Sequence, residues 1–166
     1  MTPRLLPLLA ALAVWLLQDP APNPPPAPVE VAVIVHPENK VSDPTREQLR
    51  TWLTLERQFW PEGRRVVIYL RPAATPEMEV LLKKVYRMTE PQLRQYWIRR
   101  LHTGEIPAAP SVLRSAAAAS KEVKETPGGL SIVPAAEVPA GVRVFRVDGK
   151  RPGEKGYPLV WEAAPK

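Results

Sequence analysis

The segment of residues 31–72 constrains the fold more than any other part of the chain. It opens with VAVIV, an unbroken apolar and mostly β-branched run that is typical of a strand buried on both faces. The polar sequence HPEN follows as a turn, and Asp43-Pro44-Thr45 then starts a helix, with Asp43 or Thr45 as its N-cap. Pro61-Glu62-Gly63 breaks the chain. The segment closes with a second buried strand over residues 66–70.

Apolar residues at helical spacing predict three helices. The first carries the stripe Leu49, Trp52, Leu53 and Phe59. Thr75 caps the second, with Pro76 at its first position and with Met78, Leu81, Leu82 and Val85 on its inner face. Thr89 caps the third in a near capping box, and its lining residues are Leu93, Tyr96, Trp97 and Leu101.

The remaining elements are shorter. Ser111 is predicted to cap an alanine-rich helix that runs to Glu125, and Thr126-Pro127-Gly128-Gly129 forms a turn. Short strands follow over residues 130–133 and 142–147, and the tail from Asp148 is expected to lie across the surface. The resulting order, β-α-β-α-α-α-β-β, indicates an α/β sandwich with a mainly parallel or mixed sheet.

The composition limits the classes of function. The 166 residues suffice for one domain with a core, and 45% of them are hydrophobic. A net charge of +6 suits an anionic ligand or surface, or is a solvated, Arg-rich exterior. There is no block of five like charges and no basic stripe interleaved with aromatic residues, so nucleic-acid binding is not predicted.

The sequence lacks the motifs of metal sites and enzymes. Without cysteine there are no disulfides, thiolate metal sites or thiol nucleophiles. His36 and His102 are far apart and have no ligand-like neighbours in sequence. No nucleophile elbow, Gly-rich phosphate loop or HExxH motif is present. We therefore expect no enzymatic activity, no metal and no cofactor.

The N-terminal residues predict export. Residues 1–18 contain Arg4 and then a charge-free apolar run over residues 5–17. That run is shorter than the roughly 20 residues of a membrane span, but it matches a secretory h-region, so these residues are a signal peptide or an N-terminal anchor. Residues 19–28, DPAPNPPPAP, form a stiff proline-rich linker. Residues 29–166 are the folded domain, placed in the periplasm or otherwise outside the cytoplasm, with membrane contact only through an uncleaved N-terminal segment.

These motifs, in this order, resemble the second lobe of phosphate-binding proteins of bacterial ABC transporters. The matching residues are VAVIVHPEN-KVSDPTREQLRTWL, Trp60-Pro61-Glu62-Gly63, a strand ending at Arg71, Tyr96-Trp97 with Thr103-Gly104, Thr126-Pro127-Gly128-Gly129-Leu130, and Val147-Asp148-Gly149-Lys150. The resemblance implies a single-lobe, type 2 periplasmic-binding-protein-like three-layer sandwich with a small mixed sheet. It also implies phosphate or another small oxyanion as ligand, and an ABC permease as partner.

The resemblance points to Arg71 and Thr75 as oxyanion-binding residues. The family carries an Arg followed by a Ser-Gly-Thr turn at a helix N-terminus, and the matching stretch here is Arg71-Pro72-Ala73-Ala74-Thr75. A helix N-terminus attracts anions, and a guanidinium adds a fork of donors. The alternative is that Thr75 only caps its helix and Arg71 is a solvated charge. Glu77 and Glu79 follow closely, and their charge opposes a phosphate.

Other positions depart from the family's pattern. Leu55-Glu56 stand where the family has Gly-Lys, and Ser131-Ile132 stand where it has a Gly-aromatic pair. The chain also has room for only one lobe, which would leave a bound oxyanion half hydrated. Two functions therefore remain open: an exported substrate-binding-like domain with weak oxyanion binding, and an extracytoplasmic protein-interaction module, with an envelope protein as partner, that keeps the fold without the ligand.

Overall fold

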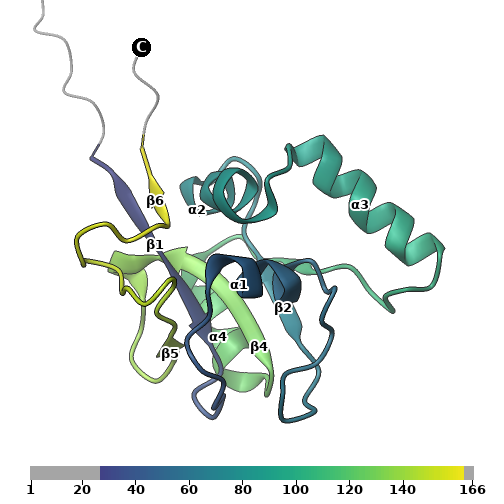
Figure 1. The fold of residues 1–166 in the computed structure, drawn as a ribbon, viewed down its shortest axis with the longest axis horizontal. Helices are drawn as coiled ribbons and strands as arrows, with labels where there is room; N and C mark the ends of the chain where they lie inside the picture. The colour runs from purple at the N-terminus through teal and green to yellow at the C-terminus, as the bar shows by residue number, and fades with distance from the viewer. Residues whose placement is uncertain (1–26, 163–166) are drawn as a thin grey trace, which may run out of the picture.

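The computed structural model describes residues 27–162, so the predictions for residues 1–18 and for most of the proline-rich linker lie outside the described residues. The elements follow one another as shown in Figure 1. They are β1 (Val29–Val35), α1 (Arg46–Leu53), β2 (Val67–Leu70), α2 (Pro76–Val80), the π-helical segment η1 (Leu81–Tyr86), α3 (Glu90–His102), β3 (Ser111–Val112), α4 (Ala116–Glu125), β4 (Gly129–Pro134), the 3₁₀ turn η2 (Ala135–Glu137), β5 (Arg143–Val144) and β6 (Val160–Trp161). Within residues 27–162, no helix is both long and apolar enough to cross a membrane.

The strands form one mixed sheet in the order β3-β2-β4-β1-β5, with β6 also paired to β1. Strand β2 runs parallel to both β3 and β4. Strand β1 runs antiparallel to β4, β5 and β6. The predicted small mixed sheet is therefore confirmed.

Strand β1 separates two hydrophobic cores. Val31, Val33 and Val35 belong to the larger core, together with residues of α1, α2 and η1. Ala32 and Ile34 face the smaller core, which contains residues of α4. Figure 1 shows the same layers, with α1 and α2 in front of the sheet and α4 behind it. The predicted three-layer sandwich is confirmed, because the apolar run of β1 is fully buried on both faces.

Three helices begin at the predicted threonines. Thr45 and Thr89 form capping boxes with Gln48 and Gln92, and Thr75 caps α2. The helix predicted to start at Ser111 instead starts after Ser115, whose hydroxyl accepts from the amide of Ala118 at 3.0 Å. The prediction was wrong because Ser111 is extended and pairs with Tyr69 of β2.

Three further expectations need correction. Phe59 lies beyond the end of α1 and is 51% exposed, because the chain turns at Leu55 with φ at +55°. Leu101 is 40% exposed, since the last turn of α3 extends away from the sheet. The strand predicted over residues 142–147 is limited to the two residues of β5.

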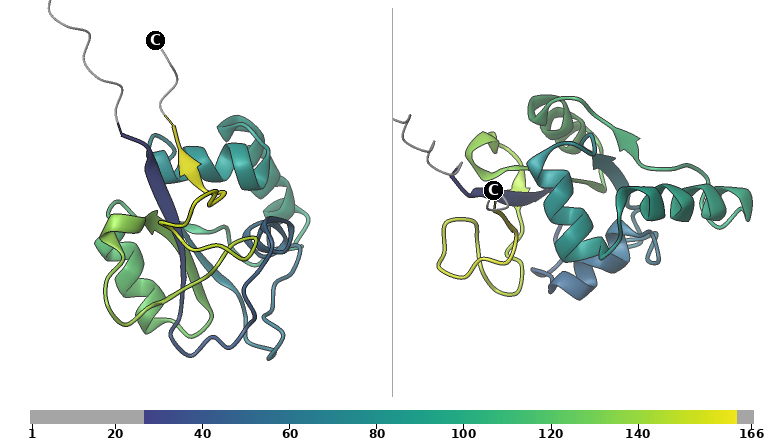
Figure 2. Two further views of the ribbon diagram at one scale, coloured as in Figure 1. Left: turned by 60° about the vertical axis from the view of Figure 1, so that its left-hand side comes forward. Right: turned by 90° about the horizontal axis from the view of Figure 1, so that it is seen from above.

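The C-terminal tail contributes to the core rather than only lying on the surface. Tyr157 and Leu159 are buried, and the Tyr157 hydroxyl donates to the carbonyl of Val31 at 2.7 Å. The amide of Val31 in turn donates to the carbonyl of Leu159 at 2.9 Å. Strand β6 then lies beside the start of β1, as Figure 2 shows. The tail folds inward because β1 would otherwise expose unpaired backbone groups along this edge.

The tryptophan corner and the glycine turn, two of the matched motifs, contact each other. The Trp60 indole donates to the carbonyl of Gly128 at 3.0 Å. Gly128 has φ at +94°, and a Cβ there would lie 2.2 Å from the carbonyl oxygen of Arg65. Only glycine fits this position. The Trp52 ring packs on Trp60 with centroids 4.6 Å apart, which closes the larger core at this end.

Two buried tyrosines predict loss of stability at high pH. Burial raises the pKa of Tyr86 and of Tyr157 well above the usual value of about 10. Because the unfolded chain ionises first, the free energy of unfolding should be unaffected by these groups below about pH 10 and should fall above it, by up to about 1.4 kcal/mol per pH unit for each tyrosine. Urea unfolding between pH 8 and pH 11 would measure the slope. In the variant Tyr86→Phe/Tyr157→Phe, the free energy of unfolding should fall less steeply above about pH 10. A fall as steep as in the wild type would contradict this assignment.

Candidate functional site

The loop from Arg71 to Thr75 connects the end of β2 to the start of α2. Its last residue, Thr75, is the N-cap: the hydroxyl accepts from the Met78 amide at 3.4 Å and donates to the Pro72 carbonyl at 2.8 Å. The Thr75 amide also donates to the Pro72 carbonyl, at 3.0 Å. Pro76, at the first helical position, has no amide to offer. Both hydrogen-bonding functions of the Thr75 hydroxyl are therefore directed at the protein itself.

Arg71 is held by the domain from two sides. Its Nε donates to Oε1 of Glu77 at 3.0 Å, and its Nη1 donates to the carbonyl of Leu113 at 2.6 Å. The side chains of Arg71 and Glu77 are only 10% and 3% exposed. The alternative that Arg71 is a solvated charge is therefore wrong, because the Leu113 carbonyl, just after β3, and Glu77 in the first turn of α2 hold the guanidinium. The structure thus gives this guanidinium an internal carboxylate as its counter-ion.

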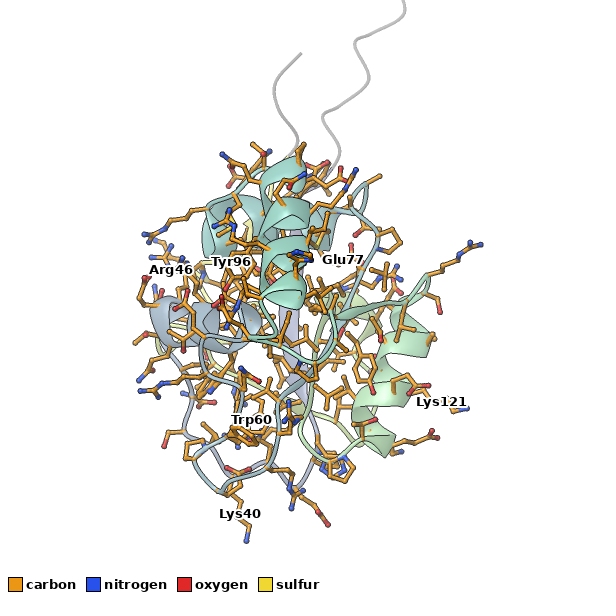
Figure 3. All side chains as sticks on the ribbon, turned by 90° about the vertical axis from the view of Figure 1, so that its right-hand side faces the viewer. Lys40, Arg46, Trp60, Glu77, Tyr96 and Lys121 are labelled. Atoms are coloured by element: carbon orange, nitrogen blue, oxygen red, sulfur yellow. The ribbon has the colours of Figure 1, made fainter. Side chains whose placement is uncertain are left out.

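The second carboxylate of α2 also has internal partners. Oε2 of Glu79 accepts from the Trp161 indole at 2.8 Å and lies 3.8 Å from Nζ of Lys83. Glu77 and Glu79 both lie in the first turn of α2, where negative charge is favoured by the unpaired amides. The helix start therefore already carries two carboxylates. Figure 3 shows Glu77 within the domain, whereas Lys40 and Lys121 extend from its periphery.

The Glu77 carboxylate balances the charge of the Arg71 guanidinium. That Arg71 and Thr75 bind an oxyanion stays a prediction. The structure brings the two residues onto one loop, and each is hydrogen-bonded to protein groups. Among residues 27–162, no cluster of three or more His, Asp or Glu side chains is placed to hold a metal ion.

No family model and no curated protein match this chain. Solved structures do match it. A candidate phosphate ABC transporter substrate-binding protein from Clostridium perfringens, solved with bound phosphate, is 17% identical with a TM-score of 0.65, covering 82% of this chain and 54% of its own. PstS from Borrelia burgdorferi is 16% identical with a TM-score of 0.64, covering 82% and 56%. An ABC-type phosphate transport receptor from Vibrio cholerae is 14% identical with a TM-score of 0.64, covering 82% and 55%.

These comparisons confirm the resemblance to phosphate-binding proteins at the level of the fold. The chain spans about half the length of the solved structures that it matches, which agrees with a single lobe. The structural neighbours are binding proteins rather than enzymes. With identities of 12–17%, the likeness shows the architecture alone.

The ion pair between Arg71 and Glu77 could not be predicted from the sequence. Glu77 is visible there only as a negative charge near the candidate anion site, six residues along the chain from Arg71. The contact requires the turn at Pro72, the N-cap at Thr75 and the carbonyl of Leu113, which belongs to a segment 42 residues away. A glutamate at the second position of a predicted helix, close behind an arginine, is the one local signal for this pairing.

The buried pair makes a prediction about stability. Glu77→Ala should lower the free energy of unfolding by about 3–5 kcal/mol, because it leaves the Arg71 guanidinium buried without its counter-ion. The double variant Arg71→Met/Glu77→Leu should recover most of that loss. Urea unfolding measures both. Glu90→Ala, which removes the exposed pair with Arg94, is the matched control and should cost less than about 1 kcal/mol. An equal, small effect at both glutamates would contradict the structural role of Glu77.

Proposed function

We propose that this protein is an extracytoplasmic protein-interaction module that has the fold of one lobe of a phosphate-binding protein. In this proposal its own Glu77 takes the place of the oxyanion. The observation that carries the proposal is the buried ion pair between Arg71 and Glu77, at 3.0 Å.

The pair opposes phosphate capture for two physical reasons. A phosphate that reached Arg71 would have to displace the Glu77 carboxylate and leave it buried without a counter-ion, which is strongly unfavourable. If Glu77 stayed in place, two like charges would lie side by side in a region of low exposure. The Thr75 hydroxyl is also occupied as an N-cap. A protein-interaction role leaves the Arg71–Glu77 ion pair and the Thr75 N-cap intact.

Helix α3 offers the surface for such an interaction. The right-hand view of Figure 2 shows it projecting from the rest of the domain. Only Leu93 and Trp97 of this helix are buried, whereas Ile98 is 52% and Leu101 is 40% exposed. These two residues are three positions apart and so lie on one helix face. An exposed apolar pair on a projecting helix, flanked by polar residues, can anchor a partner protein.

Weak oxyanion binding through Arg71 and Thr75 is the second candidate function. It is favoured by the likeness to the C. perfringens structure, which holds phosphate. In that case the protein would serve as a substrate-binding component with an ABC permease as partner. Both candidates place the domain outside the cytoplasm, with residues 1–18 as signal peptide or anchor and residues 19–28 as linker.

Phosphate titration separates the two candidates. We expect the melting temperature of the wild-type domain to be the same in millimolar phosphate and in chloride of equal ionic strength, with no saturable heat in calorimetry. In contrast, Glu77→Gln should be stabilised by phosphate, because it leaves the Arg71 charge open to an external anion.

Saturable phosphate binding by the wild type would overturn the first proposal. If that binding were lost in Thr75→Ala and Arg71→Ala, the second candidate would replace it. If it persisted in both variants, the site would lie elsewhere on the domain.

The interaction surface can be tested by photo-crosslinking in intact cells that express the full chain. A photoreactive residue at Ile98 or Leu101 should give discrete adducts with an envelope protein, because both side chains are exposed on α3. The control position is Lys121, which is exposed on α4 away from α3 (Figure 3) and should give none. Equal labelling from all three positions would contradict the surface assignment, and adducts confined to cytoplasmic proteins would contradict export.

A further inference from the structure

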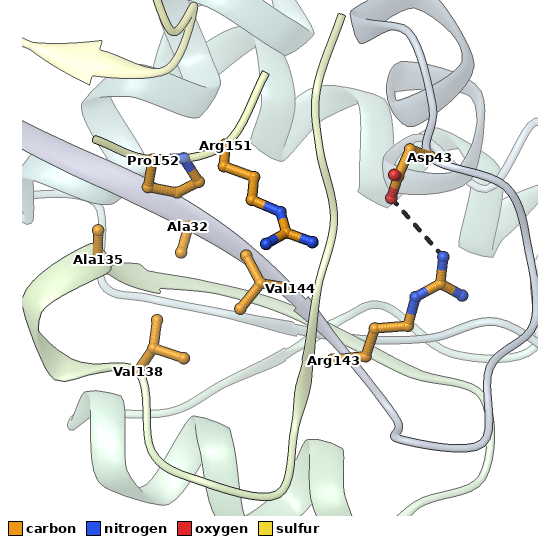
Figure 4. A pocket seen from close by; sticks show the side chains of 8 residues that line it. All are labelled: Ala32, Asp43, Ala135, Val138, Arg143, Val144, Arg151 and Pro152. Carbon is orange, nitrogen blue, oxygen red and sulfur yellow. Dashed lines mark ion pairs between the residues drawn. The ribbon is translucent and has the colours of Figure 1, made fainter. Parts of the chain in front are cut away.

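A pocket of about 520 Å³ lies beside β5. None of its lining residues belongs to the Arg71–Thr75 loop. Its lining residues are Ala32, Asp43, Ala135, Val138, Arg143, Val144, Arg151 and Pro152, all drawn in Figure 4. Five of these eight residues are apolar. Its volume lies within the range of small-molecule sites.

One of the two guanidinium groups is fixed by the protein. Nη1 of Arg143 donates to the carbonyl of Asn39, and Nη2 lies 3.6 Å from Oδ1 of Asp43. The guanidinium carbon also lies 5.1 Å from the centre of the Phe145 ring. Asp43 is itself held, since its Oδ1 accepts from the backbone amide of Arg146 at 3.1 Å. Arg143 and Asp43 therefore form a rigid, charge-balanced edge of the pocket.

The second guanidinium has no such counter-ion. Arg151 lies on a turn that is ordered by a hydrogen bond from the Arg151 amide to Oε2 of Glu154, at 3.0 Å. Its side chain extends toward Val144 in Figure 4. Arg151 takes part in none of the ion pairs within residues 27–162. Arg151 is exposed, and its guanidinium, which forms no ion pair among these residues, presents the planar set of donors that binds a carboxylate in a bidentate manner.

We propose that this pocket binds a small amphipathic monocarboxylate. Its apolar body would lie on Val138 and Val144, which are both half-buried, and its carboxylate would pair with Arg151. The charges favour a single negative charge: Arg143 and Arg151 contribute +2 and Asp43 contributes −1, which leaves +1. A dianion such as phosphate would exceed that charge. The site shares no residue with the Arg71–Thr75 loop, so it is independent of the proposed function.

Hexanoate is a suitable probe, titrated into ¹⁵N-labelled protein and followed by amide chemical shifts. We expect saturable shifts at low-millimolar concentration, centred on β5 and on the turn that carries Arg151. Hexanamide lacks the charge, and acetate lacks the apolar body. Each should bind at least roughly tenfold more weakly than hexanoate, because each loses one of the two contacts.

Variants test the two parts of the site separately. Arg151→Gln should weaken hexanoate binding by roughly tenfold, through loss of the charge-assisted pair. Ala135→Leu should weaken it by filling the pocket while leaving Arg151 in place. Arg146→Gln is the matched control, because it removes the same charge from a neighbouring residue that does not line the pocket, and it should leave the affinity unchanged.

Two results would overturn the proposal. One is the absence of saturable shifts with hexanoate in the wild-type protein. The other is an equal loss of affinity in Arg151→Gln and Arg146→Gln, which would indicate general attraction to a basic surface. The amide spectrum of each free variant shows whether it is folded, so a loss of binding can be separated from a loss of structure.

Discussion

The domain depends on the burial of β1 on both faces. All five residues from Val31 to Val35 are fully buried, and they alternate between the two cores. The same strand supplies backbone partners to β4, β5 and β6. A strand in this position cannot shift by one residue without exchanging its two sets of side chains between cores of different size. The two helical layers and the C-terminal tail are therefore placed relative to a single short segment.

This framework explains how the buried charge of Arg71 is balanced within the domain. Arg71 follows β2 directly, and β2 is held in the sheet between β3 and β4. The helix that starts at Pro76 brings Glu77 against it, and the carbonyl of Leu113 closes the other side. A charged group in such a covered position needs a counter-ion at all times. An external anion would satisfy this need only when bound, whereas a glutamate in the chain satisfies it permanently. We infer that the internal pair keeps the Arg71 charge compensated without any bound ligand.

Much of the fold could be predicted from the sequence, because it depends on local patterns. The apolar run of β1 and the threonine caps can each be recognised from a few consecutive residues. The misplaced features depend on distant neighbours. Ser111 is extended because Tyr69 pairs with it, and Leu159 is buried because β1 needs a partner. The candidate site shows the same division: Thr75 could be identified as a cap, but the pairing of Arg71 with Glu77 and the pocket beside Arg151 arise only from the tertiary structure.

The pairing of β1 with β6 has a mechanical consequence. Val29 is opposite Trp161 and Glu30 is opposite Val160, in antiparallel register, so the two ends of the described chain leave the domain side by side. Tension applied between these ends acts across the ladder and opens its hydrogen bonds one after another, starting at Val29. Tension between Val29 and helix α3 is instead carried through the whole sheet. The direction in which the domain is pulled therefore determines whether it peels open gradually or resists as a unit.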